Sequence, residues 1–158
     1  MALSPATLAA SLESSWLVPE GGEFPSSPAQ SGDRFAGAVT SWFALAMAGP
    51  YPCSTAAARR SQLTTSATAA IQAGDASLAG MQLALGLMSY MAGQVFGPGV
   101  ASPPAAVGAA QSAIIAAFSN LDASHAARAN QIATGVHALA ISTIVVFPPV
   151  ISPPAPVV

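Results

Sequence analysis

The sequence lacks lysine and contains little positive charge of any kind. Its certain cations are Arg34, Arg59, Arg60 and Arg128, and six carboxylates bring the formal net charge of the 158 residues to -2. Binding to a phosphate backbone depends on clustered lysine and arginine. We therefore expect no nucleic-acid partner.

Cysteine, histidine and phosphate-binding motifs are also scarce. Cys53 is the single cysteine, so it cannot form an internal disulfide and is expected to be a small buried side chain. His125 and His137 are twelve residues apart on one expected helix, about 120° apart around it, so they cannot share a face. No ligand spacing indicates a metal site, and no Gly-Lys-Ser/Thr or GxGxxG pattern follows a strand. We expect no enzyme activity, no cofactor and no small-molecule substrate.

A long uninterrupted apolar run is missing as well. A membrane-spanning helix needs about 20 mainly apolar residues. Residues 78–96, LAGMQLALGLMSYMAGQVF, are diluted by polar side chains and three glycines, and residues 138–146 run directly into Pro148 and Pro149. A small helical membrane protein is therefore a distant alternative.

The composition instead favours an assembly. Charged residues make up 6% of the sequence and apolar residues 53%, whereas ordinary soluble domains contain about 25% charged residues. A chain with so little surface charge has little to keep it dispersed as a monomer. We expect it to associate with copies of itself or with other proteins.

Hydrophobic periodicity predicts an all-α fold, a five- or six-helix bundle over residues 1–142. Ser4 is a good N-cap, Pro5 suits the first helical position, and Leu8, Leu12 and Trp16 form one apolar stripe. Residues 18–32, VPEGGEFPSSPAQSG, predict a long loop. The other helices are expected over residues 32–49, 54–74, 75–96, 102–120 and 123–142, with Asp75 as the N-cap of the helix over 75–96. Their many alanines and glycines predict close helix packing.

The fourth expected helix is apolar on two sides. A full apolar stripe on one side consists of Leu78, Met81, Leu85, Met88, Ala92 and Val95. Leu83, Leu87 and Met91 belong to the second side. A helix with two apolar sides is either central in its bundle or shared with a neighbouring subunit, so these three residues are either core or a subunit contact.

Arg59 and Arg60 form the one local cluster of positive charge. They are either solvated or paired with acidic groups on an adjoining subunit, because the arginine guanidinium binds carboxylates well.

The last segment, residues 143–158, ends in FPPVISPPAPVV and contains five prolines and no charge. Proline fixes the backbone in an extended course, so we predict an extended Pro-rich C-terminal arm. Its apolar residues would dock on another subunit, and residues 144–146 would add to a neighbour's sheet edge. The alternative is that the segment folds back over its own domain. The predicted docking residues are Phe147, Val150, Ile151, Val157 and Val158.

Three stretches resemble small Ala-rich structural proteins encoded among the virion genes of tailed bacteriophages: MALSPATLAASLES, DRFAGAVTSWFALAMAGP and FSNLDASHAARANQIATGVHALAISTIVVFPPVISPP. The resemblance implies a helical bundle with extended arms that bind portal, tail or capsid neighbours, and it brings no catalytic residues. We therefore expect a virion component, assembled in the host cytoplasm, in the tail, neck or baseplate. Its expected partners are copies of itself and other virion structural proteins, and a capsid decoration protein is the near alternative.

Overall fold

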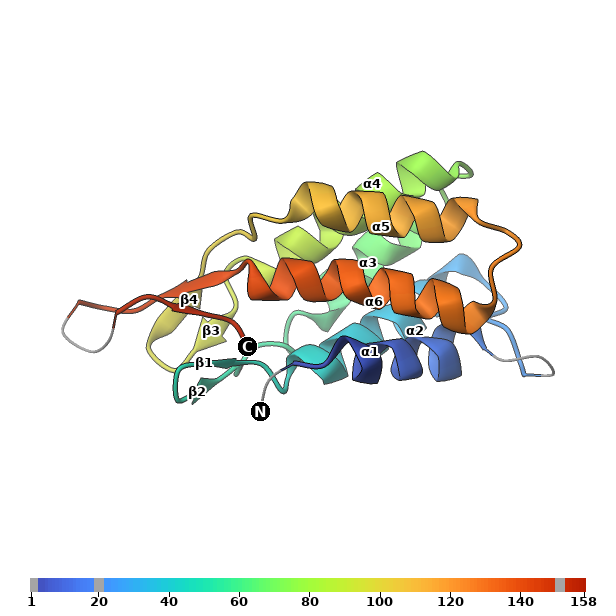
Figure 1. Ribbon diagram of the computed structural model, residues 1–158. Coiled ribbons are helices and arrows are strands. Elements are labelled where there is room, and N and C mark those ends of the chain that lie inside the picture. The colour runs from blue at the N-terminus through green and yellow to red at the C-terminus, as the bar shows by residue number, and fades with distance from the viewer. Residues whose placement is uncertain (1–2, 19–21, 150–152) are drawn as a thin grey trace.

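The computed structural model describes residues 3–18, 22–149 and 153–158. This part of the chain is mostly helical and also contains two small antiparallel sheets. Figure 1 shows the helices lying side by side in an elongated body, with the strands gathered at one end. The helices are α1 (Pro5–Leu12), α2 (Pro28–Phe43), α3 (Arg60–Ile71), α4 (Ala76–Met91), α5 (Val107–Ser119) and α6 (His125–Ile141), and a π-helical turn, η1 (Glu13–Leu17), continues α1.

Local capping signals explain where several helices begin. The Ser4 hydroxyl accepts a hydrogen bond from the Thr7 N–H at 3.4 Å, and the Asp75 carboxylate accepts one from Leu78 N–H at 2.8 Å. Both N-caps were predicted and are confirmed. Ser27 caps α2 in the same way, and Pro28 takes the first helical position, so α2 begins earlier than expected and shortens the predicted loop of residues 18–32.

The expectation of a mostly helical chain is confirmed, but the chain is not entirely helical, because two glycine-proline pairs are hairpin turns and not simple helix ends. Gly49 and Pro50 connect β1 (Met47–Ala48) to β2 (Tyr51–Pro52), and Gly97 and Pro98 connect β3 (Val95–Phe96) to β4 (Gly99–Ala101). Gly49 and Gly97 have φ angles of 58° and 56°, a backbone region that residues other than glycine rarely adopt.

Strand pairing also explains why two helices begin later than predicted. The backbone of Ser54 donates to Val95 O at 2.9 Å, and that of Ser102 donates to Ile144 O at 2.8 Å. These hydrogen bonds hold the residues before α3 and α5 in extended or turn conformations. The first helical residues are consequently Arg60 and Val107.

The last segment forms two strands of the larger sheet, β5 (Ile144–Val146) and β6 (Ala155–Pro156). The order of this sheet is β3-β4-β5-β6, so β5 is a central strand and offers no free edge to a neighbour. Its two ends are joined to the β1-β2 hairpin, because Cys53 pairs with Phe96 and Val158 exchanges backbone hydrogen bonds with Met47. The six strands thus form a continuous ring of backbone pairing.

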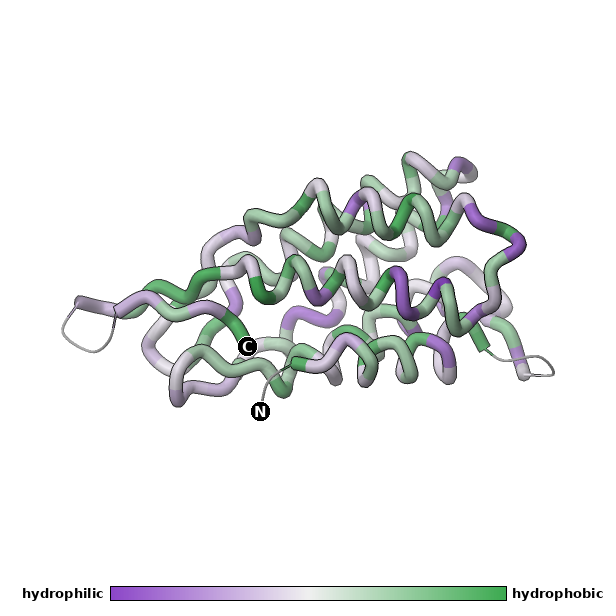
Figure 2. Tube along the Cα trace, in the orientation of Figure 1, coloured by the Kyte–Doolittle hydropathy of each residue, from purple (hydrophilic) through white to green (hydrophobic). Residues whose placement is uncertain are grey.

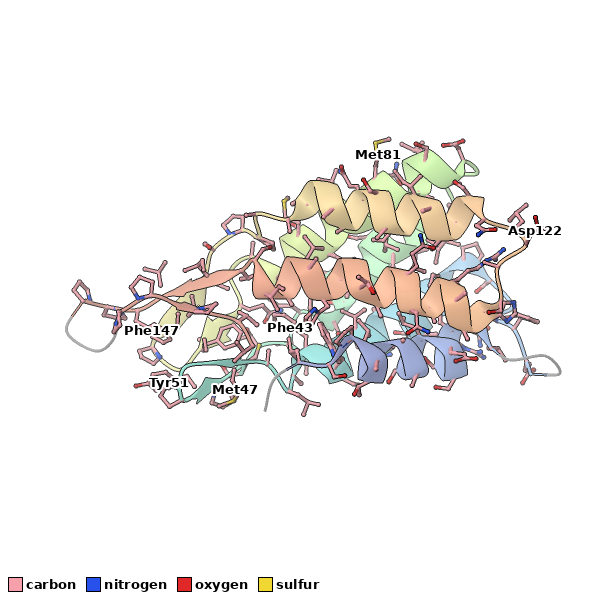
Figure 3. All side chains as sticks on the ribbon, in the orientation of Figure 1. Phe43, Met47, Tyr51, Met81, Asp122 and Phe147 are labelled. Carbon is pink, nitrogen blue, oxygen red and sulfur yellow. The ribbon has the colours of Figure 1, made fainter. Side chains whose placement is uncertain are left out.

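Close helix packing, predicted from the small residues, is confirmed where α4 contacts α5 and where it contacts α3. A Cβ added at Gly80 would lie 2.9 Å from Ile115 N of α5, and one added at Gly86 would lie 2.6 Å from Ser66 Cβ of α3. Phe43 then links the helical core to the strands, since its ring lies 5.8 Å from Tyr90 and 6.3 Å from Phe96. Figure 3 shows Phe43 between the helices and the strand end.

Candidate interaction surface

One apolar side of α4 is buried in the core, and the other side carries exposed residues. Leu83, Leu87 and Met91 are fully buried in the chain's own core. They are therefore core residues and offer no surface to a subunit contact. In the other stripe, Met88, Ala92 and Val95 are partly buried. Its remaining members are exposed, with exposed fractions of 41% for Leu78, 39% for Met81 and 46% for Leu85. We call these three residues the α4 stripe, and Figure 3 shows Met81 pointing outward from it.

Arg60 pairs with an acidic group of its own chain. Its Nη2 atom lies 2.9 Å and 3.0 Å from the two carboxylate oxygens of Asp33, which joins the start of α3 to α2. Both side chains are about half exposed. Exposed ion pairs of this kind contribute little to stability. The carboxylate partner of Arg60 was predicted on an adjoining subunit, but it comes from α2 of the same chain.

Arg59 binds the C-terminal end of α4. Its guanidinium donates to the backbone carbonyl oxygens of Ser89, at 3.0 Å, and of Ala92, and it also bonds Gln62. The last carbonyl groups of a helix have no partner within the helix and carry partial negative charge. Arg59 therefore caps α4, and its hydrogen bonds within the chain replace the predicted contact with a neighbour.

A buried polar cluster lies beside this cap. Gln94 accepts a hydrogen bond from the Thr55 hydroxyl at 2.6 Å, and the Cys53 thiol lies 3.6 Å from the same amide oxygen. The Tyr90 hydroxyl donates to Ala56 O at 3.1 Å. Burial raises the pKa of the Cys53 thiol and raises the pKa of Tyr90 to about 12, so both groups keep their protons at neutral pH. Raised values are the opposite of what an activated nucleophile needs.

The predicted docking residues of the C-terminal segment lie mainly on their own chain. Phe147 and Val157 are buried in the core, and the Phe147 ring lies 5.4 Å from Tyr51. The Val158 side chain is exposed, although its backbone pairs with Met47. Val150 and Ile151 lie outside the described residues. The described part of the segment therefore folds back over its own domain, which corrects the prediction that it docks on a neighbour.

A second exposed apolar patch was missed by the sequence reasoning. Val100 of β4 and Val146 of β5 are direct partners in the sheet, and Ile144 lies two residues from Val146 on the same face. All three side chains are exposed, whereas the alternate residues Ala101 and Val145 are buried. We call Val100, Ile144 and Val146 the sheet patch. The alternation of residues 144–147 was the one available signal, but the run is too short to distinguish an exposed face from a buried one.

A shallow pocket of about 460 Å³ lies between the start of α2 and the start of α6. Trp16, Phe24 and Ile71 give it apolar walls, and Arg128 and His125 add polar atoms. The His125 Nδ1 atom is 2.6 Å from Val18 O, and the Phe24 ring packs edge-on at 5.9 Å from the imidazole. His125 thus has a structural hydrogen bond that ties the α1–α2 loop to α6.

Within residues 3–18, 22–149 and 153–158, no three His, Cys, Asp or Glu side chains gather as they would around a metal ion. His137 lies on α6 with its ring 6.3 Å from that of Trp42. In the same part of the chain, no helix is both long enough and apolar enough to pass through a lipid bilayer.

Comparison with known proteins adds no relative: no protein-family model, curated protein or solved structure matches this chain. Among the described residues, the α4 stripe and the sheet patch each bring three exposed apolar side chains together on one face. Figure 2 shows that both α4 and the strand end include hydrophobic stretches of the chain.

Proposed function

We propose that this protein is a structural subunit of a tailed bacteriophage particle, placed in the tail, neck or baseplate, and that it acts by packing against neighbouring subunits. One observation supports this most directly. Large aliphatic side chains are exposed on two separate parts of the molecule, the α4 stripe and the sheet patch.

Two apolar surfaces on one chain suit a subunit with more than one neighbour. Contiguous exposed apolar patches mark interaction sites in soluble proteins, because water is displaced from them on binding. When the two surfaces differ, each subunit contacts one neighbour through each surface, and repeated contacts of this kind build rings and stacked assemblies. The low charge of the chain, 6% of residues, reduces the repulsion between closely packed copies.

Within this proposal, residues 1–142 act as a helical bundle and form the body of the subunit. Residues 143–158, the Pro-rich segment predicted as an arm, contribute Ile144 and Val146 to the sheet patch and also present the exposed Val158. The partners are copies of the chain and other virion structural proteins. The chain is located in the virion and acts without a cofactor.

The test is mass spectrometry of purified phage particles from cells that carry the gene, with the copy number measured against the major capsid protein. Copy numbers of about six or twelve, as expected from ring symmetry, would support a tail, neck or baseplate position. Copy numbers in the hundreds would support capsid decoration instead. Absence of the chain from washed particles would contradict the proposal.

A matched pair of variants connects the test to the surface. Val146→Asp places a charge in the sheet patch, at a side chain that is 54% exposed. Leu121→Asp places the same charge at an exposed residue of the α5–α6 turn, outside both patches. We expect Val146→Asp to reduce incorporation into particles and Leu121→Asp to leave it unchanged, while both variants keep the circular dichroism of the original protein.

A further inference from the structure

We propose that the α4 stripe is the contact between two copies of this chain, which pair through their α4 helices about a two-fold axis. This inference deepens the proposed function, because it assigns one of the subunit contacts to a surface and a partner.

The spacing of the exposed residues is the first argument. Leu78, Met81 and Leu85 are three and four residues apart, and the partly buried Met88 continues the same spacing. Alternate steps of three and four residues place side chains on the seam along which two helices interlock. The opposite side of α4 is already packed on α3 and α5. The stripe is thus a second apolar side with no partner among the described residues of the chain.

The α4 stripe also lies in a stretch of the chain without charged residues. Residues 76–121 contain no Asp, Glu, Lys, Arg or His, and they include all of α4 and α5. Figure 1 shows these two helices together along one side of the body, away from α1 and α2. A partner with a charged contact face would leave its charges desolvated and unpaired against this surface.

A second copy of the chain has a contact face without charge, because it presents the same stripe. In a two-fold contact the same patch occurs on both subunits, so each surface must be complementary to itself. A charge-free stripe has no like charges to repel its copy, and an aliphatic seam presents equivalent knobs and holes to it. α4 is about 24 Å long, from sixteen residues at about 1.5 Å each, and it is already folded, so pairing requires no helix formation.

The test uses the purified full chain and measures its mass by sedimentation velocity over a wide range of concentration. We expect a reversible dimer and a melting temperature that rises with concentration. Leu85→Asp should weaken dimerisation at least about tenfold, because it places a desolvated charge on the seam. The control is Leu45→Asp, since Leu45 is 49% exposed, close to the 46% of Leu85, and lies beyond the end of α2. We expect this control to dimerise like the original protein.

Leu85→Gln keeps the inference testable if Leu85→Asp does not fold, because glutamine is uncharged and forms helices well. A folded Leu85→Gln variant should also dimerise more weakly. A wild-type chain that stays monomeric, or Leu85 variants that dimerise unchanged, would overturn the inference. Detection of the chain in particles would leave the proposed function standing in that case. Conversely, a dimer that depends on Leu85, together with absence from particles, would support the inference and contradict the proposed function.

Discussion

Met47 and Val158 donate backbone N–H groups to each other's carbonyl oxygens, and both N···O distances are 2.9 Å. Through this pair the end of the chain is joined to the hairpin that follows α2. The pair closes the ring of six short strands, none of which is longer than three residues. The ring lies at the end of the helices nearest Phe43 and Phe96, so it covers the end of the hydrophobic core.

The first prediction concerns removal of this closure. Truncation after Ser142 removes Val145, Phe147 and Val157, which are buried in the core. Each such side chain contributes about 1.5 to 3 kcal/mol, and small domains have a total stability of only about 5 to 15 kcal/mol. We expect the truncated chain to lose cooperative thermal unfolding, measured by circular dichroism. Val146→Ala, at an exposed position of the same strand, should melt like the full-length protein.

An unchanged, cooperative melt of the truncated chain would show that the segment is dispensable for the domain. That outcome would restore the interpretation of residues 143–158 as an arm that docks on a neighbour. Prolines and valines predict an extended apolar course without indicating which chain it packs on, so the sequence is compatible with both possibilities.

Features that depend on neighbouring residues were predictable from the sequence. Ser4 and Asp75 cap α1 and α4 as expected, because a cap needs only its own side chain and the N–H groups that follow it. The stripe of Leu8, Leu12 and Trp16 is buried as expected. In both cases the physical cause lies within one helical turn or one regular period.

Features that depend on distant residues were not predictable. α4 is apolar on both sides, so periodicity alone does not show that Leu83 faces the core and Leu85 faces outward. The glycines at positions 80 and 86 were the missing signal, since they lie on the side that approaches α5 and α3. Extended structure was expected at residues 144–146, where β5 lies, but the other strands were missed because two or three residues are too few for an alternating pattern.

The second prediction compares two helix glycines. Gly80→Ala places a Cβ 2.9 Å from Ile115 N, so α4 and α5 must move apart, and we expect a loss of about 1 to 3 kcal/mol in the free energy of unfolding. Gly108 of α5 has no atom within 4 Å of an added Cβ. Gly108→Ala should therefore stabilise the protein by about 0.5 to 1 kcal/mol. Urea denaturation measures both, and equal effects would contradict the close approach at Gly80.

The third prediction separates the two neighbouring arginines. Arg59→Met keeps the aliphatic part of the side chain but removes the cap of α4, and we expect a loss of about 1 to 3 kcal/mol. Arg60→Met removes an exposed ion pair with Asp33 and should cost less than about 1 kcal/mol. The measurement is urea denaturation at low and high salt. A larger loss for Arg60→Met would show that the ion pair matters more than the helix cap.

The fourth prediction concerns alkaline pH. Burial raises the pKa of Tyr90 to about 12 from its ordinary value of 10.0, so the folded state holds this proton more tightly than the unfolded state does. The stabilisation from Tyr90 is therefore complete below about pH 10 and is lost as the pH rises toward 12. One such group lowers the free energy of unfolding by up to about 1.4 kcal/mol per pH unit in that window.

Cys53 must be removed from this measurement, because burial also raises the pKa of its thiol above the ordinary 9.0, so this second buried group also makes stability depend on alkaline pH. We therefore compare Cys53→Ala with the double variant Cys53→Ala/Tyr90→Phe by urea denaturation between pH 9 and pH 11.5. The single variant should lose stability steeply above pH 10, and the double variant should have a shallower slope because phenylalanine has no proton to release. Equal slopes would show that Tyr90 ionises as easily in the folded chain as in the unfolded one, which is incompatible with its burial and its hydrogen bond to Ala56 O.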